Sequence, residues 1–375
     1  MTIAAGKDRM KLLKSKTHFL LAIVLCAVWM SSTVFSQQTP VPPTPQPVPV
    51  VKAKEKEKEK EKEKIKTPMP AIPGALPPGV EMGDGTTTER SIAVDQKVSI
   101  QMCVTQGTVR INGWNRNEVR AFVSEGSTFG FHVAQKSMKD GSPVLISLVN
   151  IRKTQGGMAM AGDCIAGDEI EIDAPENASV SLRGRQTDIS IDSIRKVWIA
   201  NVGGDINIQN VSQGIRATTG QGDVTVENSQ GAIVLESSSG NIVAYGVEPS
   251  EVGDQFKAKT NSGAISLQKL GYRLADINSI SGTVLFTGGL LSGGTFSFTT
   301  TNGSIRLMLP DDTSCRVIAT YGYGSFDSTL PLKTLTNDVH PGPIKTVNGA
   351  IGAGGDATLR VTTNTGSIQI RKLQP

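Results

Sequence analysis

Few residues of this 375-residue sequence have the types and spacing that catalysis requires. Three histidines occur, His18, His132 and His340, and no Gly-x-Ser-x-Gly turn is present to expose a nucleophilic serine. His18 lies in an N-terminal export-type segment, His132 in the strand-like stretch FGFHVA, and His340 before a proline in a loop-like stretch. A serine–histidine–aspartate site is therefore not indicated, and we predict no catalytic residues.

A glycine-rich stretch, GAGGDA from Gly352 to Ala357, has the letters of a dinucleotide-binding turn. In such a turn a helix must follow, because its N-terminal N–H groups bind the phosphates. Here the strand-like stretch TLRVTT follows instead. We therefore expect no nucleotide, and no other cofactor.

Three aspartates, Asp188, Asp205 and Asp223, each precede a β-branched residue at the same position of a repeat. Stacked carboxylates about 5 Å apart would repel one another, and a bound Ca²⁺ would relieve the repulsion. The column then stops, because later copies carry Asn, Ala, Thr or Ser at this position. Since Ca²⁺ takes about six to eight oxygen ligands, we interpret the aspartates as solvated turn residues, with a metal column as the alternative.

The repeat itself is centred on glycine. Two residues after each glycine stands Ile or Val, four residues after it an apolar residue, and three residues before it Ser, Thr or Asn. Successive glycines are separated by 18, 18, 23, 19, 21 and finally 63 residues. A degenerate earlier copy, VSLRGRQTDISI, has Thr187 in the glycine position. The seven glycines are Gly204, Gly222, Gly240, Gly263, Gly282, Gly303 and Gly366.

A unit of strand, glycine corner and strand cannot bury its apolar side alone. Stacked copies can, because each strand pairs with its counterpart about 4.8 Å away. Glycine is needed where φ is positive or a Cβ has no room, and the small polar residues before it can hydrogen-bond along the stack. We therefore predict an all-β fold, a β-solenoid with rungs of 18 to 23 residues and an irregular C-terminal rung as cap. A sandwich of antiparallel hairpins is the alternative.

The N-terminal segment has the layout of a secretory signal, with a basic start, an apolar run from Phe19 to Met30 and small polar residues up to Ser36. An uncleaved membrane anchor is the alternative, since residues 19–35 reach the short limit for a span. Leu25 before Cys26 argues against a lipoprotein signal. We expect export to the periplasm, the cell surface or the extracellular space.

The domain organisation follows from composition. A proline-rich segment with a Lys-Glu tract that alternates singly predicts a disordered spacer. Short alternating segments from Glu89 to Ala174 predict a β-rich cap region before the repeats. The predicted parts are a signal or anchor at 1–36, a linker at 37–80, and a solenoid domain at 81–375 that divides into 81–180 and 181–375.

The net charge of +4 does not by itself indicate an acidic partner. Residues 1–18 carry five Lys or Arg and one Asp, and residues 52–66 carry eight Lys and five Glu. No charged side chain lies in 19–51, so residues 67–375 have a net charge of −3. The predicted folded part thus shows no basic stripe for a phosphate backbone, and we expect no nucleic-acid partner.

Export permits one disulfide among the three cysteines that follow the signal, Cys103, Cys164 and Cys315. Their spacing matches no zinc site. We prefer the pair Cys103–Cys164 because both precede the repeats, while the pairs with Cys315 stay open.

From about Gln101 to Lys372 the chain resembles the bacterial putative-adhesin family of β-solenoid repeat domains. The resemblance rests on GTVRINGWNRNEVRA at Gly107–Ala121, on the Ser/Thr-x-x-Gly-x-Ile/Val copies and on the ending GAGGDATLRVTTNTGSIQIRK. It implies a surface or periplasmic binding role and brings no catalytic residues. We therefore expect a non-enzymatic adhesin or envelope scaffold that binds a polysaccharide or protein. A carbohydrate-active lyase or glycosidase and a subunit of an envelope stress-sensing assembly are the alternatives.

Overall fold

The computed structural model describes residues 79–86, 88–155, 157–338 and 343–374. All their regular structure is β, from β1 (Val80–Glu81) to β29 (Ile368–Lys372), which confirms the all-β prediction. The expected signal and nearly all of the expected spacer lie outside these residues. In the described ranges no helix is long and apolar enough to span a membrane.

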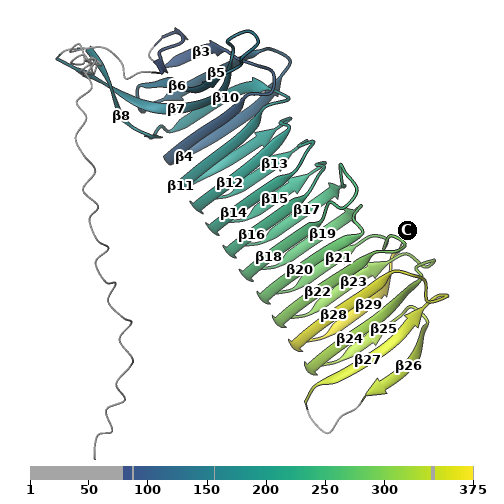
Figure 1. Ribbon diagram of the computed structural model, residues 1–375. Coiled ribbons are helices and arrows are strands. Elements are labelled where there is room, and N and C mark those ends of the chain that lie inside the picture. Colours follow the sequence, from purple (N-terminus) through teal and green to yellow (C-terminus); the bar gives the residue numbers. More distant parts are fainter. Residues whose placement is uncertain (1–78, 87, 156, 339–342, 375) are drawn as a thin grey trace, which may run out of the picture. The chain divides into compact units, whose positions relative to one another are not determined.

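Two-stranded rungs stack in parallel through the middle of the described chain (Figure 1). Equivalent residues pair directly, for example Ile215 with Ile233 and Val224 with Ile242, so the predicted β-solenoid is confirmed. The first strands of the rungs are β12 (Lys196–Gly203), β14 (Ile215–Gln221), β16 (Ile233–Ser239), β18 (Phe256–Ser262), β20 (Leu274–Ser281) and β22 (Thr295–Asn302). The second strands are β13 (Ile206–Gln209), β15 (Val224–Glu227), β17 (Ile242–Val247), β19 (Ile265–Leu270), β21 (Val284–Thr287) and β23 (Ile305–Leu309).

The glycine corner is imposed by the rung before it. A Cβ on Gly222 would lie 2.2 Å from the carbonyl oxygen of Gly204, and a Cβ on Gly240 would lie 2.0 Å from that of Gly222. No real Cβ approaches an oxygen so closely. At Gly222 the φ of 128° adds a backbone conformation that L side chains rarely adopt. Close approach along the stack is therefore the main reason for glycine here.

Buried hydroxyl groups bind the same carbonyl oxygens. Ser237 donates to the Gly222 oxygen at 3.0 Å, Thr260 to the Gly240 oxygen at 2.9 Å and Thr300 to the Gly282 oxygen at 3.1 Å. All three hydroxyl residues are buried. The Ser/Thr column three residues before the glycines thus satisfies carbonyls whose loss of a partner would cost about 1–3 kcal/mol each.

A second corner, six residues after the glycine, was not identified from the sequence. Asn210, Asn228, Gly246 and Lys269 occupy it in successive rungs with φ between 47° and 63°. Asn and Gly adopt such angles most readily, so their recurrence was an available signal. Lys269 is the exception, and its ammonium lies 3.0 Å from the Tyr245 hydroxyl of the preceding rung.

The first rung precedes residue 181, the predicted start of the repeats. It is the long strand β4 (Ser99–Trp114), which pairs in parallel along the whole of β11 (Ser179–Asp192). Gly107 takes the corner of β4, where a Cβ would overlap the carbonyl of Gly167. The repeat signal was missed because the 64 residues between β4 and β11 separate this rung from the others in the sequence.

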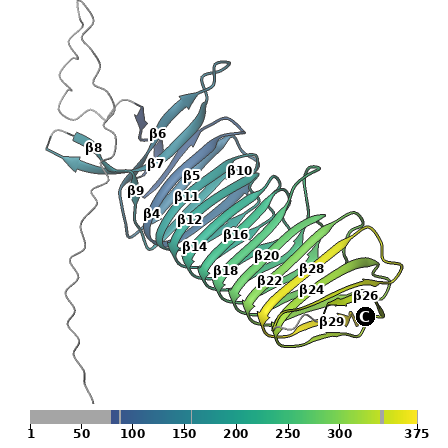
Figure 2. The same ribbon diagram turned by 60° about the horizontal axis from the view of Figure 1, so that its bottom comes forward.

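The N-terminal β-rich region covers the outer edge of this first rung (Figure 2). Three strands pair with β4 in turn, β7 (Pro143–Thr154), β9 (Cys164–Ile165) and β10 (Glu169–Pro175). The remaining strands of the region are β2 (Asp84–Gly85), β3 (Glu89–Ala93), β5 (Glu118–Ser124), β6 (Phe129–Lys136) and β8 (Gly157–Gly162). This arrangement protects an edge that would otherwise pair with another chain.

At the C-terminal end the spatial order of rungs departs from their order in sequence. β28 (Thr358–Thr365) lies between β22 and β24 (Cys315–Tyr323), and β29 lies between β23 and β25 (Phe326–Ser328) (Figure 1). The Gly366 rung is therefore regular and internal. The irregular cap is formed by the preceding segment, with β26 (Leu332–Asp338) and β27 (Lys345–Ile351) continuing the sheet antiparallel.

We predict that Gly222→Ala lowers the free energy of unfolding by about 2–3 kcal/mol, because the new Cβ meets a backbone oxygen at a strained φ. Denaturant melts measure the loss. Gly289→Ala is the matched control, since a Cβ there meets nothing within 4 Å. Equal stability of the two variants would show that the corner tolerates a side chain.

Candidate functional site

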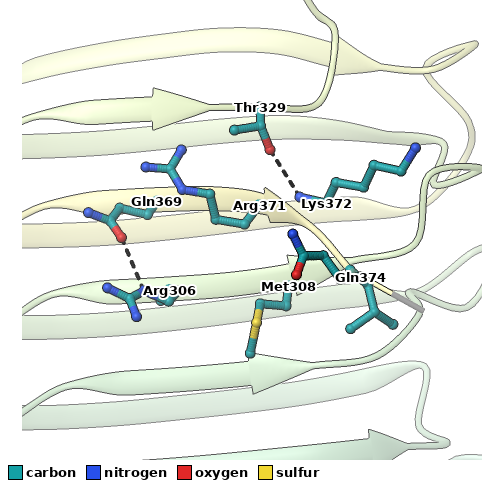
Figure 3. Close-up of a pocket in the computed structure, with 8 residues that line it drawn as sticks. Arg306, Met308, Thr329, Gln369, Arg371, Lys372 and Gln374 are labelled. Carbon is teal, nitrogen blue, oxygen red and sulfur yellow. Dashed lines mark hydrogen bonds between the residues drawn. The ribbon is translucent and has the colours of Figure 1, made fainter.

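A groove lies at the C-terminal end of the solenoid, over β23, β29 and the end of β25 (Figure 3). Its volume is about 980 Å³. These neighbouring parallel strands direct alternate side chains outward, which brings together residues far apart in the sequence. The lining consists of Arg306, Met308, Thr329, Gln369, Arg371, Lys372, Leu373 and Gln374.

Three basic side chains dominate the groove. Arg371 pairs with Asp327 at 2.6 Å and Lys372 with Asp311 at 2.6 Å. Arg306 differs, because its Nε donates to the neutral Gln369 amide oxygen at 3.1 Å and it has no ion-pair partner among the described residues. Its guanidinium is exposed and leaves donors for a carboxylate, sulfate or phosphate group.

The lining of the groove is cationic, amide and apolar in composition. It contains no carboxyl or imidazole group, and Lys372 is its only titratable amine. Met308 and Leu373 add apolar surface, and Gln374 adds an amide. The sequence analysis did not identify any of these residues, because Arg306 and Arg371 become neighbours only through the inserted last rung.

The alternative of a carbohydrate-active enzyme requires paired carboxylates. Glu89, Glu171 and Asp173 line a pocket of about 230 Å³, but Arg120 lies among them. Its guanidinium binds Asp173 at 2.5 Å and approaches Glu89 to 3.6 Å. The hydrogen bond to Asp173 raises the pKa of Arg120, which stays charged. These carboxylates therefore belong to an ion-pair network across β3, β5 and β10.

The structure shows no catalytic triad at the histidine that lies within the described residues, His132. His132 is a strand residue of β6, as expected, and lines a pocket of about 220 Å³ with Ser147 and Asp163. No hydrogen bond joins its ring to either group in the described part of the chain, whereas a triad depends on those bonds. His340 lies outside the described residues. Gly352 forms a turn that leads into β28, without a helix.

The aspartate column forms a ladder along the corner. The Asp188 carboxylate accepts the backbone N–H of Asp205 at 2.9 Å, and the Asp205 carboxylate accepts that of Asp223 at 2.8 Å. The Asp223 carboxylate accepts the N–H of Asn241 at 2.7 Å, and Asn241 continues the ladder to Ala264 at 2.9 Å. One carboxylate oxygen of each aspartate is thus committed to the backbone of the next rung.

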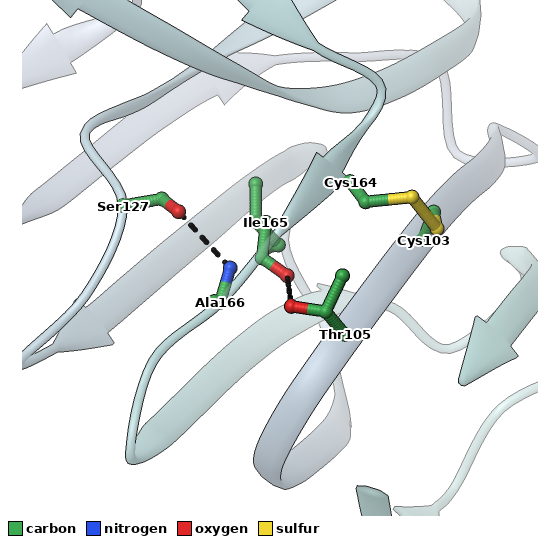
Figure 4. Close-up of a disulfide and its surroundings, with 6 residues drawn as sticks. All are labelled: Cys103, Thr105, Ser127, Cys164, Ile165 and Ala166. Carbon is green, nitrogen blue, oxygen red and sulfur yellow. Dashed lines mark hydrogen bonds between the residues drawn. A yellow bond between two sulfur atoms is a disulfide. The ribbon is translucent and has the colours of Figure 1, made fainter. Parts of the chain in front are cut away.

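Cys103 and Cys164 form a disulfide between directly paired residues of β4 and β9 (Figure 4). Nearby, Thr105 donates to the Ile165 carbonyl at 3.4 Å, and Ser127 accepts the Ala166 N–H at 3.0 Å. The bond attaches the covering strand β9 to the first rung. Cys315 is a buried free thiol, and burial raises its pKa to about 11, so it does not supply a thiolate nucleophile.

The fold is a β-solenoid with a groove at its C-terminal end. Residues 149–284 match the family model described as Toastrack DUF4097. This match confirms the resemblance to a bacterial family of β-repeat domains of unknown function.

Two further comparisons are less informative. A solved structure of a putative cell adhesion protein from Clostridium sporogenes aligns over 76% of this chain and 98% of its own, with 11% identity and a TM-score of 0.19. A score this low does not establish a common fold. The search of curated proteins found no significant match.

We predict that the melting curve is the same in millimolar Ca²⁺ and in EDTA, because one oxygen of each aspartate already accepts a backbone N–H and too few oxygens remain for the ion. Asp205→Asn keeps an acceptor and leaves stability nearly unchanged. Asp205→Ala removes it and lowers stability by about 0.5–1.5 kcal/mol. A Ca²⁺-dependent rise in melting temperature that Asp205→Asn abolishes would show a metal site.

We predict that the double variant Cys103→Ser, Cys164→Ser loses about 2–4 kcal/mol of stability, because the disulfide closes a loop of about 60 residues in the unfolded chain. Dithiothreitol should lower the melting temperature of the parent protein to that of the double variant. It should leave the melting temperature of the variant unchanged. Non-reducing peptide mass spectrometry checks the bond directly. Free thiols at both positions after export would contradict the prediction.

Proposed function

We propose that this protein is an exported, non-enzymatic binding protein, an adhesin or envelope scaffold that presents its solenoid surface to an envelope or extracellular ligand. The observation that carries the proposal is the composition of the groove, in which cationic, amide and apolar side chains occur without a carboxyl or imidazole group. Such a lining supports ligand binding and lacks the groups for bond cleavage.

The geometry of the rungs supports the same conclusion. Outward side chains on parallel strands diverge from a flat surface, whereas catalysis uses groups that converge in a water-excluding site. The regular register fixes each side chain about 4.8 Å from its counterpart. A rigid array of this kind suits recognition of an extended ligand, such as a polysaccharide or a protein surface.

Export is supported by two independent features. The signal-type N-terminal segment directs secretion in the sequence-based prediction. The Cys103–Cys164 bond is of a kind that persists in oxidising compartments and is rare in the cytosol. We propose the periplasm, the cell surface or the extracellular space as the site of action, with attachment through the N-terminal segment where it stays uncleaved.

We predict that the purified full-length chain binds components of a polysaccharide and protein array and turns none of them over. The same preparation is incubated with hydrolase and lyase substrates, and product release is measured. Arg306→Ala is expected to weaken binding of groove ligands about tenfold, because a charge-assisted pair contributes roughly 1.5–3 kcal/mol. Gln268→Ala, an exposed polar residue of another rung, serves as the control.

Catalytic turnover of a glycan would favour the lyase or glycosidase alternative instead. An array without any ligand would remove the basis for an adhesin.

A further inference from the structure

The outward face of one sheet carries half of the basic side chains of residues 181–375. This sheet runs in the spatial order β11, β12, β14, β16, β18, β20, β22, β28 and β24. Its inward residues are buried, and its outward residues include eight exposed cations against two acids, Glu236 and Asp276. The cations, here called the basic face, are Arg183, Arg185, Lys196, Arg216, Lys257, Lys259, Arg316 and Arg360.

The net charge did not reveal this distribution, and the expectation of no nucleic-acid partner stays a prediction. The net charge of −3 over residues 67–375 conceals a separation of charge between the two sheets. The second sheet carries Asp188, Asp192, Asp205, Asp223 and Glu227 on its N-terminal half, with no basic outward residue in β13 or β15. A sum over the sequence cancels these charges, while the rungs place them on different faces.

The basic face is only partly compensated, because Lys257 is paired in register with Asp276 and Lys259 with Glu236, whereas no acid is paired with the other six cations. None of its eight cations forms an ion pair within the described residues. Arg216 lies between Trp198 and Val234, and Arg360 lies between Ser297 and Ile318. No two of these cations are paired in register, but together they give the face a positive potential, and a bound polyanion would lower that potential.

The dimensions favour a linear ligand. Nine strands at about 4.8 Å span roughly 38 Å. Four outward positions per strand, from residue −8 to −2 relative to the glycine, give a width of roughly 20 Å. Between the cations lie hydroxyl and amide side chains such as Thr218, Asn278, Thr299 and Thr362, which can hydrogen-bond sugar hydroxyls.

We propose that the basic face binds a linear acidic polysaccharide, with carboxylate or sulfate groups paired to its Arg and Lys side chains.

A nucleic acid fits this face less well. Duplex DNA carries one charge per about 1.7 Å, or roughly 22 charges over the same length, against the eight cations of the basic face. Single strands need stacking platforms, and the exposed aromatic side chains of these strands are Trp198 and Tyr323, which lie on distant rungs. The acidic half of the second sheet would also repel a ligand thick enough to overhang the corner.

The proposal rests on the proposed binding function and names the ligand class. Its test uses the full-length chain with dextran sulfate and polygalacturonate as acidic probes and dextran as the neutral one. We expect binding of both acidic probes, weakening as salt rises from roughly 0.05 to 0.3 M, and no comparable binding of dextran. The double variant R216E/R360E should bind at least about tenfold more weakly, corresponding to about 1.4 kcal/mol.

The matched control is R152E/K139E, which makes the same change of charge at exposed positions of the N-terminal region. It should bind within about twofold of the parent protein, and equal melting temperatures of the three proteins exclude misfolding. Equal weakening in both variants, or none in R216E/R360E, would overturn the proposal. So would tighter binding of duplex DNA or of phosphatidylglycerol vesicles than of either acidic polysaccharide at 0.15 M salt.

Failure of this proposal is distinguishable from failure of the proposed function. Binding of dextran equal to that of dextran sulfate, or binding insensitive to R216E/R360E, leaves a binding protein whose ligand lies elsewhere on the surface. Turnover of a glycan, or no ligand on the array, would contradict the function itself.

Discussion

The close approach of each glycine corner to the carbonyl of the preceding rung is the contact on which the rest of the structure depends. It sets how near two rungs can come, because the missing Cβ leaves room for the oxygen at the corner. The hydroxyl three residues earlier then binds that oxygen, as Thr260 does at the Gly240 carbonyl. With rung spacing and register fixed in this way, the inward residues form continuous buried columns, and β ladders run unbroken on both sheets.

The core adjusts to this constraint as the rungs change size. In the N-terminal rungs the apolar inward residues are Val, Ile, Leu and Ala, with Met102 in β4. Larger side chains enter further along, including Phe256, Phe286, Phe296 and Phe298, all fully buried. Tyr272 fills the same interior, with its hydroxyl 2.5 Å from the Gly231 carbonyl and 2.8 Å from the Glu248 carbonyl. The larger side chains accompany the longer rungs after Gly240, where successive glycines lie 23, 19 and 21 residues apart instead of 18.

The sequence predicted those features that repeat within each copy, including the alternation of strands, the glycine corner and the Ser/Thr column. It did not reveal the rungs whose copies depart from the pattern. β4 lies far from the other copies in the sequence, and the rung at Gly324 has Tyr321 in the hydroxyl position and Phe326 in the β-branched position. The insertion of β28 between β22 and β24 could not be predicted, because parallel pairing is satisfied equally by either order of the last two rungs.

Surface properties were the least predictable, for a geometric reason. A solenoid places on one face residues that are two apart within a strand and about one rung apart along the chain, so a stripe of like charge never appears as a run in the sequence. Arg216 and Arg360 share one column although 144 residues separate them.

The same geometry assigns stability and recognition to different residues of each strand. Inward residues and corner contacts hold the stack, while outward positions carry an acidic ladder on one sheet and a basic face on the other without disturbing the core. Flat faces of this kind gain affinity by repeating weak contacts along an extended ligand, which is why binding follows more naturally than catalysis from this architecture.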